Sequence, residues 1–184
     1  MMKADRVKRP KTKPTWSDVK VKLGEFDRAG LMQLVADLYA FNKDNKAFLH
    51  ARFGLGPNPL NDYKKRIGVA LAPDLNRKRH AEVSVATAKK ALSEYKKAVG
   101  DPLVILDLHV FWCETAVGFS MEYGFADEGY FDALALQYRE ACWSLAALKE
   151  PQLTEYIERL QAVRDEAQMG YGVHDYMNDV LGDL

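Results

Sequence analysis

Helix boundaries recur so regularly along this chain that they leave little room for other regular structure. Two segments open with a polar residue followed by proline, at Asn58-Pro59 and Asp101-Pro102. Proline is favoured at the first helical position because its missing N–H is not needed there. Gly124 stands where the second of these segments would end, since glycine readily adopts the left-handed C-terminal conformation. Period-two alternation is short and β-branched residues are sparse. The pattern predicts an all-α protein.

Between these boundaries, apolar residues recur at three- and four-residue spacings, which is the periodicity of a helix with one buried face. One such stripe consists of Leu31, Leu34, Val35, Leu38 and Tyr39, and we expect it to face the core. We predict a compact domain of about eight or nine helices, with helical hairpins packed as a bundle or a short solenoid-like array. The expected helices begin near residues 17, 27, 42, 59, 84, 102, 127, 151 and 173.

The start of the chain differs from the rest in composition. Residues 1–15 are rich in lysine and arginine and lack the apolar segment of a secretory signal. We predict a basic flexible tail there and a single helical domain over 16–184. A chain of this length can bury roughly 70% of the surface that it exposes when unfolded.

The cysteines and the longest apolar run bear on the cellular compartment. Cys113 and Cys142 are flanked by apolar residues and form no CxxC motif, which favours reduced cysteines without a disulfide. The run from Leu103 to Cys113 is interrupted by Asp107 and His109, and we expect it to be too short to span a bilayer. We therefore expect a cytoplasmic protein with no membrane association.

The net charge of zero conceals two opposite halves. Residues 1–100 contain 22 Lys and Arg against 10 Asp and Glu, a net of +12, and residues 101–184 contain 4 against 16, a net of −12. The excess charges are either solvated surface on halves that pack together, or they face an acidic partner or a second molecule. The second interpretation predicts weak self-association below about 50 mM salt that fades above roughly 300 mM, where screening is strong.

The predicted central helix carries two carboxylates seven residues apart, Asp107 and Glu114, which places them on one stripe. A buried carboxylate without a partner would cost several kcal/mol. The stripe is therefore either a satisfied polar network or groove edge, or a functional pocket in which one carboxylate acts as ligand or general base. We expect Glu114 to lie within hydrogen-bond reach of His174, Tyr123 or a backbone donor near Gly172.

The segment GYGVHD supplies the second group of candidate polar residues, His174 and Asp175, at the start of the last helix. Asp175 would be favoured at the positive end of a helix without any other role. The alternative is that both residues meet Glu114 in space and form a metal or enzyme site, although their spacing matches no specific metal motif. We predict no cofactor and no resident metal.

Known catalytic motifs do not occur in the chain. It contains no GxxxxGK[ST], GxGxxG after a strand, HExxH or GxSxG. The segment AKKALSEYKKAVGDP is similar to the end of a tetratricopeptide repeat, but no second copy follows at the repeat spacing of about 34 residues. These absences favour a protein that is not an enzyme.

Several segments, in this order, resemble a bacterial family of domains of unknown function over about residues 16 to 182. They are LMQLVADLYAFNKDNKAFLHARF, YKKRI, AKKALSEYKKA, ETAVGFSMEYG followed by Asp127-Glu128, and GYGVHDYMNDVL. The resemblance implies a compact helical protein and no assigned activity. The family often has tryptophan where this chain has Tyr171. The positions that match the family pattern are Glu114, Tyr123, Gly124, Gly172, His174 and Asp175.

The sequence is compatible with three classes of function. We favour a non-catalytic protein-interaction or scaffold module, in which stacked amphipathic helices present a charged face to a protein partner. A nucleic-acid-associated protein is the alternative, and an enzyme or metal site at Glu114 and His174 is the third. The cations that would contact nucleic acid are Lys3, Arg6, Lys8, Arg9, Arg77, Lys78 and Arg79.

Overall fold

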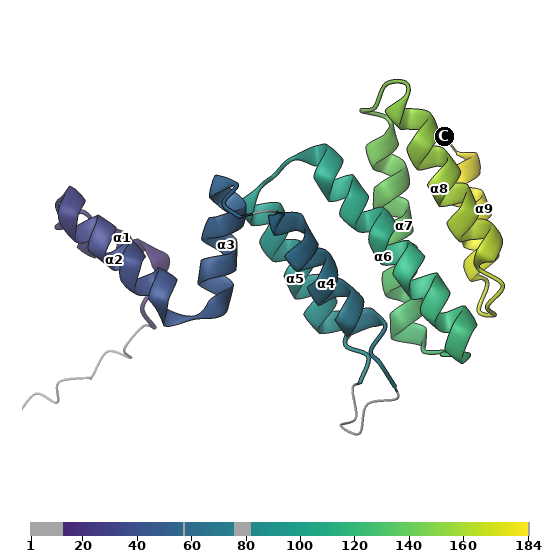
Figure 1. Cartoon of the computed structure of the whole chain (residues 1–184), viewed down its shortest axis with the longest axis horizontal. Helices are drawn as coiled ribbons and strands as arrows, with labels where there is room; N and C mark the ends of the chain where they lie inside the picture. Colours follow the sequence, from purple (N-terminus) through teal and green to yellow (C-terminus); the bar gives the residue numbers. More distant parts are fainter. Residues whose placement is uncertain (1–12, 57, 76–81, 184) are drawn as a thin grey trace, which may run out of the picture. The chain divides into compact units, whose positions relative to one another are not determined.

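The computed structural model describes residues 13–56, 58–75 and 82–183, and in these ranges it contains nine α-helices and no strand. The all-α prediction is confirmed, as is the expected number of helices (Figure 1). The helices are α1 (Trp16–Leu23), α2 (Arg28–Phe41), α3 (Lys43–Phe53), α4 (Pro59–Leu71), α5 (Val85–Ala98), α6 (Pro102–Tyr123), α7 (Glu128–Leu145), α8 (Gln152–Glu166) and α9 (Val173–Gly182).

The chain forms two compact units, where the sequence led us to expect one domain over 16–184. The first unit ends at Lys46 and the second begins at Ala47, so the boundary falls within α3. The two units differ in burial: α1 and α2 contain no buried residue, whereas every buried apolar residue of the described chain belongs to the second unit. We describe each unit by itself.

In the first unit, local side chains set where the two helices begin. Helix α1 begins one residue before the expected start near residue 17. Its N-cap is Thr15, whose backbone N–H donates to the Asp18 carboxylate at 2.7 Å. Asp27 caps α2 by accepting from the Gly30 N–H, also at 2.7 Å. The prediction that the Leu31–Leu38 stripe of α2 faces a core is wrong, because no α2 residue is buried. The spacing of the apolar residues in α2 predicted a helix correctly, but it did not show which surface covers that helix.

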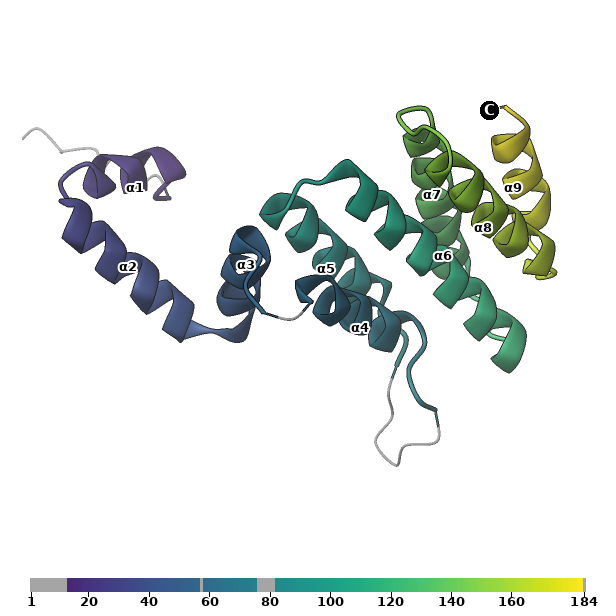
Figure 2. The ribbon, with the colours of Figure 1, turned by 45° about the horizontal axis from the view of Figure 1, so that its top comes forward.

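In the second unit, three helical hairpins stack in two rows, and successive helices run antiparallel (Figures 1 and 2). The hairpins are α4–α5, α6–α7 and α8–α9. Helix α6 contacts α4 and α8 in one row, and α7 contacts α5 and α9 in the other. Each hairpin thus buries its apolar faces against its neighbours, as in a short solenoid.

Helix α6 lies at the centre of this unit, where it contacts α4, α5, α7 and α8. Trp112 and Leu108 are completely buried on one side of it and Val110 on the roughly opposite side, whereas the stripe that carries Asp107 and Glu114 is only partly buried. Contrary to our expectation from its interrupted apolar run, α6 is long and apolar enough to cross a membrane by length and composition. More than half of its most apolar stretch is buried inside the protein.

Two buried tyrosines join α7 to the neighbouring helices through their hydroxyl groups. The Tyr130 hydroxyl donates to the Leu71 carbonyl at 3.1 Å, at the end of α4. The Tyr138 hydroxyl donates to the Leu160 carbonyl of α8 at 3.0 Å. Burial raises the pKa of both phenols, so both remain donors. These bonds fix α7 against both neighbouring hairpins.

Candidate functional site

An ion-pair network crosses one row of the second unit, from α4 through α6 to α8. Asp107 accepts from the Lys64 ammonium at 2.6 Å and from Nη1 of Arg159 at 2.9 Å. Arg159 also donates to both oxygens of Glu114, from Nε at 2.8 Å and Nη2 at 2.9 Å. The fork of one guanidinium therefore serves two carboxylates, a geometry that lysine could not reproduce.

The network is partly shielded from solvent, and its charges stabilise one another. The side chains of Asp107 and Arg159 are 18% and 26% exposed. Burial by itself would raise the pKa of Asp107, but hydrogen bonds from Lys64 and Arg159 outweigh it and lower that pKa. The same pairing, above all with Glu114, raises the pKa of Arg159. This arrangement joins three hairpins and commits both carboxylates to protein partners, which favours the interpretation of a satisfied polar network.

The expected partners of Glu114 were wrong, because its carboxylate is held by Arg159 and not by His174, Tyr123 or the backbone near Gly172. Tyr123 ends α6, is 45% exposed, and has a raised pKa because of its hydrogen bond with Glu122. Sequence reasoning missed Arg159, which lies 45 residues after Glu114. Its position beside Tyr156 on the amphipathic α8 gave no sign of the pairing.

His174 and Asp175 lie on α9, apart from the ion-pair network. His174 Nδ1 accepts from the Asn178 amide at 3.1 Å and lies 3.7 Å from a carboxylate oxygen of Asp175. Asp175 makes no capping bond and its side chain is 90% exposed. No hydrogen bond or ion pair within the described ranges joins either residue to Glu114. In the same ranges no three His, Cys, Asp or Glu side chains gather as a metal site would require.

A buried polar pair that the sequence analysis did not identify links α6 to α7. The ring of His109, 2% exposed, places Nδ1 2.7 Å from the Gln137 side-chain oxygen. Burial, together with the positive charge of Lys96, lowers the pKa of His109 from 6.5 to about 4, against the opposing effect of Gln137. The imidazole is therefore neutral at pH 7 and Nδ1–H donates to Gln137. The position of His109 on the central helix was the only sequence signal.

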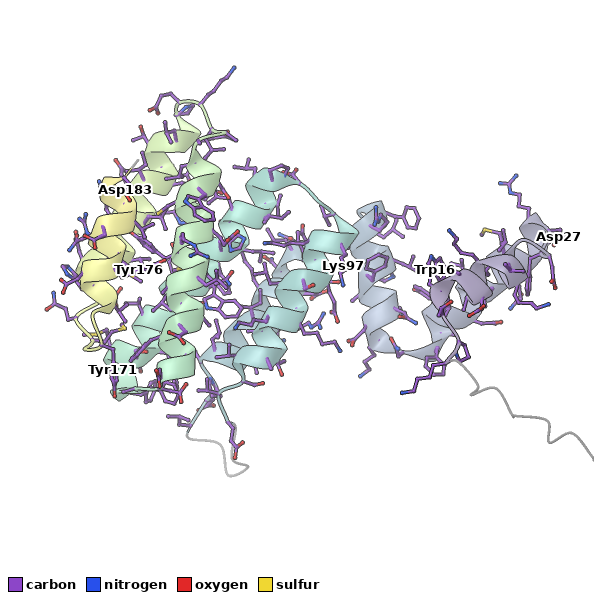
Figure 3. The ribbon with its side chains drawn as sticks, turned by 180° about the vertical axis from the view of Figure 1, so that it is seen from behind. Trp16, Asp27, Lys97, Tyr171, Tyr176 and Asp183 are labelled. Atoms are coloured by element: carbon purple, nitrogen blue, oxygen red, sulfur yellow. The ribbon has the colours of Figure 1, made fainter. Side chains whose placement is uncertain are left out.

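A groove of about 450 Å³ runs between α7 and the start of α9. Figure 3 shows Tyr171 just before α9 and Tyr176 further along it. Tyr171 has a φ of 65°, a left-handed conformation that is unfavourable for a residue with a side chain, and its ring is 74% exposed. The ring centroid of Phe131 lies 5.4 Å from that of Tyr171. The strained backbone thus holds an aromatic ring at the edge of the groove.

The groove carries charges of both signs. Glu128 and Asp132, one helical turn apart on α7, are both exposed and line it beside Tyr171. Arg139 lines it two turns further along α7, with its guanidinium carbon 4.8 Å from the ring centroid of Trp143. The Arg139 Nε is buried and has no hydrogen-bond partner among the described residues. The groove therefore offers two carboxylates, two tyrosine rings and one arginine side chain.

The charge of the surrounding surface is strongly acidic. Residues 127–183 contain 12 Asp and Glu against 4 Lys and Arg, a net of −8. The hairpin α4–α5 is basic, with Lys65, Lys89, Lys90 and Lys97 exposed. The predicted nucleic-acid contacts Lys3, Arg6, Lys8, Arg9, Arg77, Lys78 and Arg79 all lie outside the described residues.

No family model, curated protein or solved structure matches this chain. The resemblance to a bacterial family of domains of unknown function therefore remains a hypothesis.

Proposed function

We propose that this protein is a non-catalytic interaction module that binds a Lys- or Arg-rich segment of a partner protein in the groove between α7 and α9. The observation that carries the proposal is that Glu128, Asp132 and the exposed ring of Tyr171 line the same groove. Carboxylates attract a cationic side chain, and an aromatic face stabilises it further by about 0.5–1 kcal/mol at an exposed site.

The remaining groove chemistry supports a peptide rather than a free cation. A peptide carries several cationic side chains, which can meet the two carboxylates and the Tyr171 ring at the same time. A volume of about 450 Å³ is large enough for a long side chain and its flanking backbone. The acidic surface over residues 127–183 would speed the approach of a basic segment and repel an acidic one.

Binding of a labelled Lys/Arg-rich peptide, measured by fluorescence anisotropy, tests the proposal. The double variant Glu128→Gln, Asp132→Asn should weaken binding at least about tenfold, equivalent to about 1.4 kcal/mol. The matched control is Glu155→Gln, Glu158→Gln, which removes the same two charges from exposed positions on α8. Equal weakening by both pairs would mean that only the general acidity of the surface matters, and the proposed groove would be rejected.

A second variant separates the aromatic contribution from the charge. Tyr171→Gly removes the ring and also relieves the left-handed strain, because glycine adopts a φ of 65° without penalty. We expect this variant to fold normally and to bind the peptide about threefold to tenfold more weakly. Unchanged affinity would remove Tyr171 from the site.

Nucleic-acid binding is the alternative and is measured in the same assay with a labelled single-stranded DNA. Its structural support is the set of exposed lysines on α4 and α5, Lys65, Lys89, Lys90 and Lys97. If DNA binds with steep salt dependence while the Lys/Arg-rich peptide does not bind, the nucleic-acid function replaces the one proposed.

A further inference from the structure

The first unit exposes apolar side chains that a folded protein normally covers. Nine large apolar residues of α1, α2 and the turn between them are exposed, and α1 and α2 bury none. Trp16 is 64% exposed, Met32 62% and Phe41 81%. Figure 3 shows Trp16 in α1 and Asp27 at the start of α2. An apolar surface of this extent typically marks an interaction site.

The size of this unit makes the lack of a core more significant. The unit spans residues 1–46, close to the length of about 40 residues below which folded units usually need a disulfide, a metal or association with another chain. Both cysteines, Cys113 and Cys142, are buried in the second unit. No metal-binding group of side chains occurs in the described residues. Association with another chain is one way to stabilise α1 and α2.

The apolar stripe of α2 has the same pattern in both directions. Its order is Leu31, two residues, Leu34, Val35, two residues, Leu38. A two-fold axis perpendicular to α2 between Leu34 and Val35 would bring Leu31 of one copy opposite Leu38 of another. Such a two-fold interface requires that each residue and its counterpart exchange places, and this sequence meets that requirement with similar side chains.

The charge of α2 also permits two copies to approach. The helix carries one arginine, Arg28, and one aspartate, Asp37, so its own net charge is zero, although residues 1–46 together contain 11 Lys and Arg against 6 Asp and Glu, a net of +5. A strongly charged surface would repel its own copy and would call for a partner of opposite sign. An apolar helix face with no net charge, which complements itself, neither repels a second copy nor needs a partner of opposite charge.

We infer that the apolar face of α2 pairs antiparallel with the same face of a second copy of this chain, with α1 extending the interface. The nine exposed side chains present on the order of 900 Å², at about 100 Å² each, close to the ~800 Å² that each partner contributes to a standard interface. The driving force is apolar burial, so the dimer persists above roughly 300 mM salt, unlike association through the oppositely charged halves. The inference does not depend on the α7–α9 groove.

Two neighbouring substitutions in the full-length chain test the pairing by analytical ultracentrifugation. Val35→Asp places a carboxylate in the paired stripe, and Ala36→Asp places one on the opposite side of α2. Both positions are exposed in the isolated chain, so neither change should disturb its fold. We expect a dimer for the unmodified chain and for Ala36→Asp, and a dissociation constant at least about 100-fold higher for Val35→Asp.

Cysteine cross-linking tests the register without adding charge. A mixture of the Leu31→Cys and Leu38→Cys variants should give more disulfide-linked dimer on oxidation than either variant alone, because the antiparallel register places these two positions opposite each other. The native cysteines are buried, and burial raises the pKa of Cys142 to about 12, so both should react slowly.

Each outcome bears directly on the inference. A monomer at all concentrations for the unmodified chain overturns it, as does an equal loss of dimer in Val35→Asp and Ala36→Asp. A dimer that dissociates when salt is raised to roughly 300 mM points instead to the charged halves. Cross-linking of Leu31→Cys mainly to itself would indicate a parallel pairing and would reject the proposed register.

Discussion

Helices α2 and α6 are both rich in apolar residues, yet they differ completely in what covers them. Helix α6 contacts four other helices and buries ten of its residues, whereas α2 buries none. The periodicity of apolar residues predicted both helices. It did not predict their environments, because a stripe of leucines indicates only that some surface should cover it. The surface that covers α6 belongs to the same chain, and we infer that the surface covering α2 belongs to a second copy.

Tryptophan substitutions should give the largest difference between the two units. Trp112 is fully buried on α6, and Trp112→Ala should lower the free energy of unfolding by about 3–5 kcal/mol, because it removes a large side chain and leaves a cavity. Trp16 is 64% exposed, and Trp16→Ala should change the free energy of unfolding by less than about 0.5 kcal/mol in the isolated chain. Urea unfolding at low protein concentration measures both. A large loss for Trp16→Ala would show that α1 is covered within the monomer.

Acid should destabilise the second unit through His109. Because the pKa of His109 falls from 6.5 to about 4 on folding, the unfolded chain binds more protons between those values. The contribution of His109 to the free energy of unfolding is therefore complete above about pH 6.5 and decreases as the pH falls to 4, by about 3 kcal/mol in total. Urea unfolding over this pH range checks it. The variant His109→Gln should have a flatter profile, and an unchanged slope would contradict the assignment to His109.

Breaking the ion-pair network should have a smaller but clear effect. Arg159→Met leaves Asp107 and Glu114 without their shared guanidinium, and we expect the free energy of unfolding to fall by about 2 kcal/mol, less than for a fully buried pair. Arg164→Met is the control on the same helix, because among the described residues the ion-pair partner of Arg164 is the exposed Asp165 next to it. That change should cost less than about 0.5 kcal/mol. Equal costs for the two variants would mean that the network does not join the hairpins.

The smallest predicted effect concerns the hydroxyl of Tyr130. Tyr130→Phe keeps the buried ring but removes the donor to the Leu71 carbonyl, and should lower the free energy of unfolding by about 1 kcal/mol. Differential scanning calorimetry provides the measurement, with Tyr176→Phe, at a half-buried position, as the control for a simple loss of hydroxyl. If Tyr130→Phe melts like the unmodified chain, the bond contributes nothing to holding α7 against α4.

The local features of the sequence determined the helices of this protein. Caps such as Asp101 and Asp127, and the left-handed Gly124, fix helix ends through groups only a few residues away, so the pattern predicted the all-α class and most helix starts. Local spacing along the helix also placed Asp107 and Glu114 on one stripe of the central helix. These properties depend on neighbouring residues, and the sequence contains them directly.

Only the tertiary structure decided which side chains meet. Glu114 pairs with Arg159 across 45 residues and His109 with Gln137 across 28, and no local spacing predicts either contact. Sequence patterns could not separate two units either, because the apolar stripe of α2 has the periodicity of a core helix. Hydrophobic burial has no directional preference and depends on whichever surface comes within reach. The three-dimensional path of the chain therefore determined which side chains contact one another, and helix periodicity alone did not predict these contacts.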